Sequence, residues 1–103
     1  MPRELFEELL TRSQYANSPH FSLRFRIQGS SPRFGVSVSK KISKSAVVRN
    51  SVRRRVYASL REEVPHITPG LYLFVAKTGS GVIKGDTLTS EIKNLLVSAK
   101  LIV

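Results

Sequence analysis

The chain has 103 residues, 41% of them hydrophobic, and 17 Lys and Arg residues against 7 Asp and Glu residues give it a formal net charge of +10. This length supports one compact core and not two, so we expect one domain over residues 1–103. The chain has no cysteine, which excludes disulfides and thiolate metal sites, and its amino-terminal segment contains acids and no long apolar run. We expect a cytoplasmic protein without a membrane partner.

The positive charge is concentrated in one part of the chain. No acidic residue occurs between Arg12 and Arg61, and most of the arginines and lysines lie in that interval. Charge of one sign repels itself unless an anion neutralises it, and solubility alone does not require that acids be excluded. The pattern predicts an RNA partner for the segment from Lys40 to Arg61.

The apolar spacing predicts secondary structure from the amino terminus onward. Residues 2–12 have helical spacing and early acids, which predicts a first helix, and the turn-forming residues around Tyr15 leave room for a short edge strand. Residues 21–27 and 34–38 alternate between apolar and polar side chains. They predict two antiparallel strands joined directly as a hairpin.

The polar positions of these two strands are expected to share one sheet face. Cations and small hydroxyls on such a face donate hydrogen bonds to phosphate oxygens without bulk. The expected residues are Arg24, Arg26, Arg33, Ser37, Ser39 and Lys41. An ordinary solvent-exposed face has the same pattern, so the sheet alone does not decide between the two interpretations.

The period then changes to that of a helix. Ser45 is its expected N-cap, and an apolar stripe from Val48 to Val64 is its expected inner face. The outer face and its edge carry Asn50, Arg54, Tyr57 and Arg61 together with Arg49 and Arg53, and Lys44 precedes them. Cations one turn apart repel each other, and an RNA backbone would neutralise them and make binding salt-dependent. We predict that these residues bind RNA.

The carboxyl-terminal part predicts core elements and little chemistry. Residues 71–76 read as a strand buried on both sides, followed by a glycine-rich loop and a third helix capped by Asp86. That loop lacks the spacing of phosphate-binding loops. His20 and His66 are expected to have no carboxylate neighbour, and the acids are scattered. We therefore predict no catalytic or metal-binding residue in the chain itself.

The stretch RFGVSVSKKISKSAVVRNSVRRRVYASLREE, residues 33–63, resembles the signature region of the protein subunit of bacterial ribonuclease P. In that family a strand of the form VGLSVSKK leads into a helix with an Arg-Asn-x-x-basic-Arg pattern. Residues 34–41 match the strand, and Arg49, Asn50, Arg53 and Arg54 match the helix. The resemblance implies an α+β domain of order α-β-β-β-α-β-α, similar to a ribosomal-protein second domain, with an unusual left-handed β-α-β crossover.

The resemblance also implies a function. In such enzymes the catalyst is an RNA, which removes the 5′ leader of precursor tRNA with Mg²⁺ held mainly by RNA. The Arg-Asn helix would contact the catalytic RNA. The single-stranded leader would contact Phe6, Ser37, Ser39 and Lys41, and an aromatic ring stacks readily on an unpaired base. The implied partners are ribonuclease P RNA and precursor tRNA, and not DNA.

Three positions depart from the family pattern. Ser51 replaces the second arginine of an Arg-Asn-Arg motif, although Arg55 adds a charge nearby. Arg24 and Leu10 occupy positions that are often aromatic, which predicts fewer stacking contacts and more electrostatic ones. Two alternatives stay open: a general RNA chaperone or ribosomal-type protein, which the motif disfavours, and a self-sufficient nuclease, which the scattered carboxylates disfavour.

Overall fold

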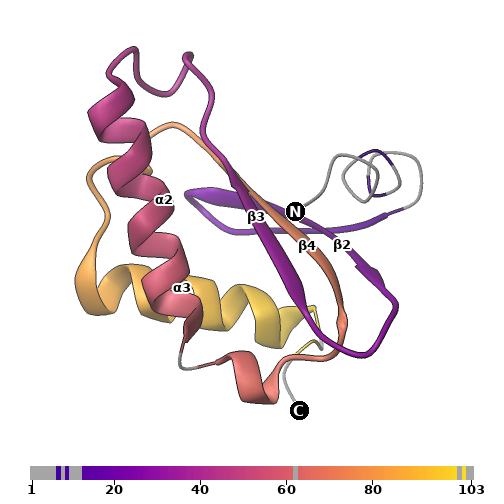
Figure 1. Cartoon of the computed structure of the whole chain (residues 1–103). Helices are drawn as coiled ribbons and strands as arrows, with labels where there is room; N and C mark the ends of the chain where they lie inside the picture. Colours follow the sequence, from indigo (N-terminus) through magenta and orange to yellow (C-terminus); the bar gives the residue numbers. More distant parts are fainter. Residues whose placement is uncertain (1–6, 8, 10–12, 62, 100, 102–103) are drawn as a thin grey trace.

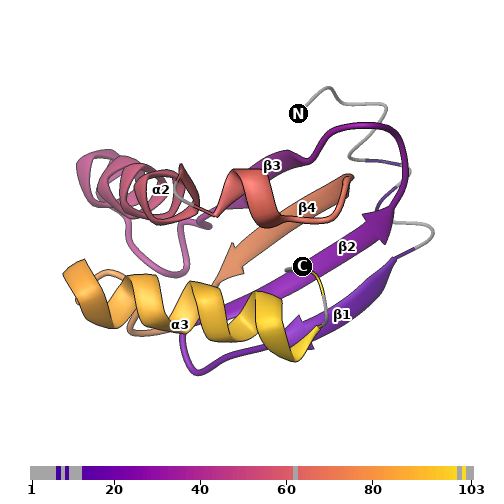
Figure 2. The same cartoon turned by 90° about the horizontal axis from the view of Figure 1, so that it is seen from below.

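The computed structural model describes residues 7, 9, 13–61, 63–99 and 101 (Figure 1). Its elements are β1 (Gln14–Asn17), β2 (Phe21–Ile27), β3 (Arg33–Ser37), α2 (Ala46–Arg61), a 3-10 turn η1 (Val64–His66), β4 (Gly70–Ala76) and α3 (Gly85–Ser98). Residues 7 and 9 are helical, and the rest of the predicted first helix, including Leu10, lies outside the described residues. The fold is α+β, with α2 and α3 on one face of a four-stranded sheet (Figure 2).

The strand order is β1-β2-β4-β3, with β4 antiparallel to β2 and parallel to β3. The predicted direct hairpin between the strands at 21–27 and 34–38 is therefore wrong, because β4 lies between them. The physical reason is that β4 has apolar side chains on both faces, and such a strand is stable only in the interior of a sheet. Strand β3, which carries polar residues on one face, takes the edge position next to β4.

The segment β3-α2-β4 crosses between neighbouring parallel strands. Figures 1 and 2 together show β4 to the left of β3 when the sheet is viewed from the helix side with both strands pointing upward. The crossover is therefore left-handed, as the family resemblance implied, against the common right-handed rule.

The main core lies between the two helices and the sheet. The inner side chains of the central strands β2 and β4 meet the apolar stripes of both helices. The buried set includes Phe21, Leu23, Phe25, Tyr72, Phe74, Val52, Val56, Leu60, Leu88, Ile92, Leu95 and Leu96. The periods of 2.0 in the strands and 3.6 in the helices thus direct apolar side chains into the same core, as the sequence predicted. The prediction is wrong for Val48 and Val64, the two ends of the expected stripe on α2, because both are exposed and Val64 lies beyond the end of the helix.

The helix ends follow the predicted signals in one case and not in the other. The Val48 backbone N–H donates to Ser45 Oγ at 3.3 Å, so Ser45 caps α2 as expected. Helix α3 instead begins at Gly85 with Lys84 in the cap position. The prediction that Asp86 caps α3 is wrong, and Asp86 lies in the first turn, where its charge still suits the helix dipole.

Candidate nucleic-acid interface

Helix α2 turns its basic side away from the core. Val52, Val56 and Leu60 are buried, whereas a second set of side chains is exposed along the opposite side. This set, called the outer strip below, consists of Asn50, Arg54, Tyr57 and Arg61. Helical geometry lines these residues up along the axis, so the sequence prediction of one polar face is confirmed.

Two arginines at the border of the outer strip are held in place by hydrogen bonds. Arg49 Nη1 donates to the Ser43 carbonyl oxygen at 2.9 Å, and Arg53 Nη1 donates to Asn50 Oδ1 at 2.8 Å. Each guanidinium has further N–H groups that can donate to an outside acceptor. The two bonds therefore orient the cations and leave other N–H donors of each guanidinium available. A further cation, the exposed Lys44, lies just before the helix.

Arg55 does not join the outer strip. Its Nη1 donates to the Gly81 carbonyl oxygen at 2.9 Å, in the loop that precedes α3. Its charge is therefore directed toward the α3 side of the molecule. The expectation that Arg55 supplies charge close to Ser51 in place of the family arginine is not supported by this geometry.

The sheet face opposite the two helices, called the second sheet face below, is the other candidate surface. Strand pairing places Arg24 beside Leu73, which is in turn beside Gly35. The neighbouring rows join Ser22, Val75 and Ser37, and Arg26, Leu71 and Arg33. Paired positions share a face, so hydroxyls and cations border an apolar stripe on β4. Leu9 packs on that stripe and is buried.

Two predicted leader contacts, Ser39 and Lys41, lie beyond the end of β3. β3 ends at Ser37, and residues 40–42 form a turn in which the Ile42 N–H donates to the Ser39 carbonyl oxygen at 3.0 Å. Ser39 and Lys41 are exposed there, so their predicted place on the sheet face is wrong. The chain bends away once β3 no longer pairs with β4. Phe6 lies outside the described residues.

Sequence reasoning missed an aromatic side chain on the second sheet face. Tyr15 of β1 pairs with Arg24 of β2, and the guanidinium carbon of Arg24 lies 5.0 Å from the centroid of the Tyr15 ring. The Tyr15 side chain is 58% exposed. The sequence indicated a short edge strand around Tyr15, but only the register of β1 against β2 places the tyrosine ring beside Arg24.

The prediction that His20 has no carboxylate neighbour is also wrong. Glu91 of α3 accepts hydrogen bonds at Oε1 from His20 Nδ1 (2.6 Å) and at Oε2 from the Ser18 hydroxyl (2.5 Å) and the His20 backbone N–H (2.9 Å). Burial alone would raise the pKa of the Glu91 carboxyl, but these bonds outweigh burial and hold the pKa below its usual value. Seventy-one positions separate His20 from Glu91, so no local pattern could show the contact.

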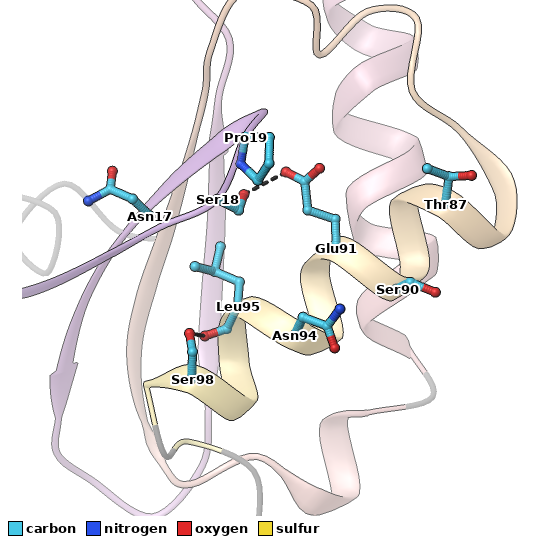
Figure 3. A pocket seen from close by; sticks show the side chains of 9 residues that line it. All are labelled: Asn17, Ser18, Pro19, Thr87, Ser90, Glu91, Asn94, Leu95 and Ser98. Carbon is cyan, nitrogen blue, oxygen red and sulfur yellow. Dashed lines mark hydrogen bonds between the residues drawn. The ribbon is translucent and has the colours of Figure 1, made fainter.

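A pocket of about 460 Å³ lies beside this cluster, between the β1–β2 turn and α3 (Figure 3). Its lining is Asn17, Ser18, Pro19, Thr87, Ser90, Glu91, Asn94, Leu95 and Ser98. Both Glu91 oxygens are already occupied by donors of the protein. The cluster therefore fastens the β1–β2 turn to α3, and the Lys77 ammonium adds a hydrogen bond to the Ser18 carbonyl oxygen at 2.9 Å.

The described residues contain neither a candidate metal site nor a candidate membrane span. No three side chains of the types His, Asp and Glu come together in that part of the chain in a way that could hold a metal ion. Among the same residues, no helix has the length and apolar character needed to cross a membrane.

The α+β fold has one basic helix face and one basic sheet face. Such surfaces are typical of proteins that bind nucleic acids, and they define the class of this protein. The model of the ribonuclease P family matches residues 2–100. The chain belongs to the ribonuclease P protein family.

The relatives and solved structures agree with this assignment. The ribonuclease P protein component of Rippkaea orientalis is 32% identical, over 98% of this chain and 84% of its own length. That of Microcystis aeruginosa is 41% identical, over 68% of this chain and 59% of its own length. The ribonuclease P protein of Staphylococcus aureus has a TM-score of 0.89 at 19% identity, covering 100% of this chain and 95% of its own. The Thermotoga maritima protein has a TM-score of 0.82 at 21% identity, covering 91% and 90%. These two structures confirm the fold.

Proposed function

We propose that the chain is the noncatalytic protein component of a ribonuclease P, which assists an RNA catalyst in removing the 5′ leader of precursor tRNA. The observation that carries the proposal is the arrangement of the family motif on α2. Asn50 and Arg54 are exposed, and Arg49 and Arg53 are oriented by hydrogen bonds to Ser43 and Asn50 while retaining further N–H donors. The relatives from Rippkaea orientalis and Microcystis aeruginosa are ribonuclease P protein components, which supports the same assignment.

Helix α2 is the proposed contact for the catalytic RNA. Arg54 and Arg61 are exposed on the outer strip and lie two turns apart, about 10 Å along the helix axis. Arg49, Arg53 and Lys44 add cations at its border and start, and Tyr57 offers an exposed ring between them. This surface suits a folded RNA whose phosphates approach the helix from the solvent side.

The second sheet face is the proposed contact for the single-stranded leader. Arg24 and Arg26 lie on one side of the apolar stripe, and Ser37 lies on the other. Leu71 and Leu73 of the stripe are buried with Leu9, so the proposed contact depends on the bordering donors, which suit the phosphates of a single strand. We extend the proposal to Phe6, and to Ser39 and Lys41, which lie beyond the end of β3 and would contact a strand that leaves the sheet there.

The Mg²⁺ needed for the cleavage is proposed to bind mainly to the RNA. Within the outer strip, Asn50 offers a hard oxygen ligand, but its Oδ1 already accepts a hydrogen bond from Arg53, and further arginines lie beside it on α2. RNA phosphates supply the oxygen ligands that Mg²⁺ prefers. The role proposed for this chain is to bind and orient the two RNAs, while the hydrolysis is the work of the RNA.

One assay tests the proposal. Cleavage of precursor tRNA is measured with the chain alone, with a cognate ribonuclease P RNA alone, and with both, at low Mg²⁺ concentration. We expect the chain alone to be inactive and the mixture to cleave faster than the RNA alone. A chain that cleaves unaided is a nuclease, and one that binds both RNAs without changing the rate is a general RNA-binding protein. Either result overturns the proposal.

A further inference from the structure

A lateral row of side chains crosses all four strands on the second sheet face. Tyr15 of β1 pairs with Arg24 of β2, Arg24 pairs with Leu73 of β4, and Leu73 pairs with Gly35 of β3. The only large ring in this row stands at its β1 end, where the guanidinium carbon of Arg24 lies 5.0 Å from the ring centroid. At the other end of the row, Gly35 has no side chain, and Leu73 is buried in a cluster with Leu9.

We propose that Tyr15 and Arg24 form a stacking platform for one unpaired base of the leader, with a purine preferred for its larger ring. The inference rests on the proposed function and names a base contact within it. The aromatic group that position 24 lacks is supplied by the neighbouring strand. The site therefore stacks on a base as well as attracting a phosphate, which revises the expectation that Arg24 brings fewer stacking contacts and more electrostatic ones.

The geometry of the pair suits a base. Arg24 covers one part of the ring and holds it by a cation–π contact, while 58% of the tyrosine side chain stays exposed to a second partner. An incoming base can stack on the free π-surface, and the guanidinium lies close enough to donate to the phosphate of the same nucleotide. A base in a duplex is already stacked, so the platform favours single-stranded RNA.

A purely structural role for Tyr15 explains less. The Tyr15 side chain is exposed and lies outside both buried clusters, on a strand of four residues at the edge of the sheet. The neighbouring Ala16, on the other face of β1, is the residue of that strand that packs against the core. An exposed ring that contributes little to the core is available for a ligand.

The experiment measures binding of holoenzyme, reconstituted from the chain and a ribonuclease P RNA, to precursor tRNA and to mature tRNA. The variants are Tyr15→Leu, Tyr15→Phe, and Gln14→Leu as the control on the opposite face of the same strand. We expect Tyr15→Leu to weaken binding of precursor tRNA about tenfold, with mature tRNA unchanged. Tyr15→Phe and Gln14→Leu should bind like the wild type, because both keep the ring.

An abasic scan of the leader locates the base. One abasic position is expected to weaken wild-type binding by a similar factor, and Tyr15→Leu should add no further loss at that position. A 2-aminopurine placed there should be quenched by the wild type and by Tyr15→Phe. This second readout needs no variant that lacks the ring, so a folding defect in Tyr15→Leu does not remove the test.

Each remaining outcome has a definite meaning. Equal loss on mature tRNA, a Phe variant as weak as the Leu variant, or unchanged binding of Tyr15→Leu overturns the platform. If the wild-type holoenzyme itself does not distinguish precursor from mature tRNA, the leader-binding part of the proposed function fails. A wild type that does distinguish them, with Tyr15→Leu unchanged, refutes the platform and leaves the proposed function standing.

Discussion

The Arg55 guanidinium donates a hydrogen bond of 2.9 Å to the Gly81 carbonyl oxygen, whereas the next residue toward the amino terminus, Arg54, is exposed on the outer strip. Two adjacent arginines thus have different roles. One fastens α2 to the loop before α3, and the other is free to meet a phosphate.

The pair makes a matched test of phosphate binding. We expect Arg54→Ala to weaken RNA binding and to lower the slope of log affinity against log salt by about one unit, since one phosphate contact is lost. Arg55→Ala should leave the slope unchanged and lower the free energy of unfolding by about 1 kcal/mol. Binding titrations at several salt concentrations check the first result, and urea unfolding checks the second. An equal slope for wild type and Arg54→Ala would contradict a phosphate contact there.

Ser51 offers the reverse test. It stands where the family pattern has an arginine, and Arg55 is directed elsewhere. We expect Ser51→Arg to add one phosphate contact and to raise the salt slope by about one unit. Ser51→Gln, which adds length without charge, is the control. The same titrations measure both, and a slope that stays at the wild-type value would show that no phosphate lies near position 51.

Glu91 makes stability depend on pH in the acidic range. The pKa of Glu91 in the folded chain is below the usual 4.5. The contribution of its carboxylate to the free energy of unfolding is therefore complete above pH 4.5 and is lost as the pH falls through the folded pKa. We expect Glu91→Gln to lower the free energy of unfolding at pH 7 by about 1 to 3 kcal/mol, because Ser18 and His20 lose a charged acceptor. The difference from wild type should shrink below about pH 4.

Urea unfolding at several pH values measures this difference. Asp86→Asn, an exposed acid in the first turn of α3, is the control and should show a much smaller effect. A constant difference between Glu91→Gln and wild type from pH 7 to pH 3 would contradict the assignment of the acid-range stability to Glu91.

Gly70 is a position where a single methyl group should disturb the sheet. A Cβ at this residue would lie 2.5 Å from the Arg26 carbonyl oxygen and 3.2 Å from the Ile27 Cα, and neither backbone atom can move easily. We expect Gly70→Ala to lower the free energy of unfolding by about 1 to 3 kcal/mol. Gly81→Ala, whose Cβ would lie 3.6 Å from a Val48 methyl, is the control and should stay within about 0.5 kcal/mol of wild type. Similar midpoints for the two variants would argue against the close approach of β2 and β4.

Local patterns were sufficient for the helices and for the family. The spacing of Val52, Val56 and Leu60 predicted which side of α2 is buried, and hence that Arg54 and Arg61 are exposed. This works because helical periodicity depends only on neighbouring residues. The motif from residue 33 to residue 63 is equally local, so the family could be named from the sequence.

Contacts between distant segments needed the tertiary structure. Strand β4 enters between β2 and β3, Glu91 meets His20, and Tyr15 pairs with Arg24. Strand order and register follow from how whole strands bury their faces and satisfy their backbone hydrogen bonds together, which no single segment encodes. The sequence by itself therefore determined the basic helix face and its partner class, and only the tertiary structure decided which side chains share the second sheet face.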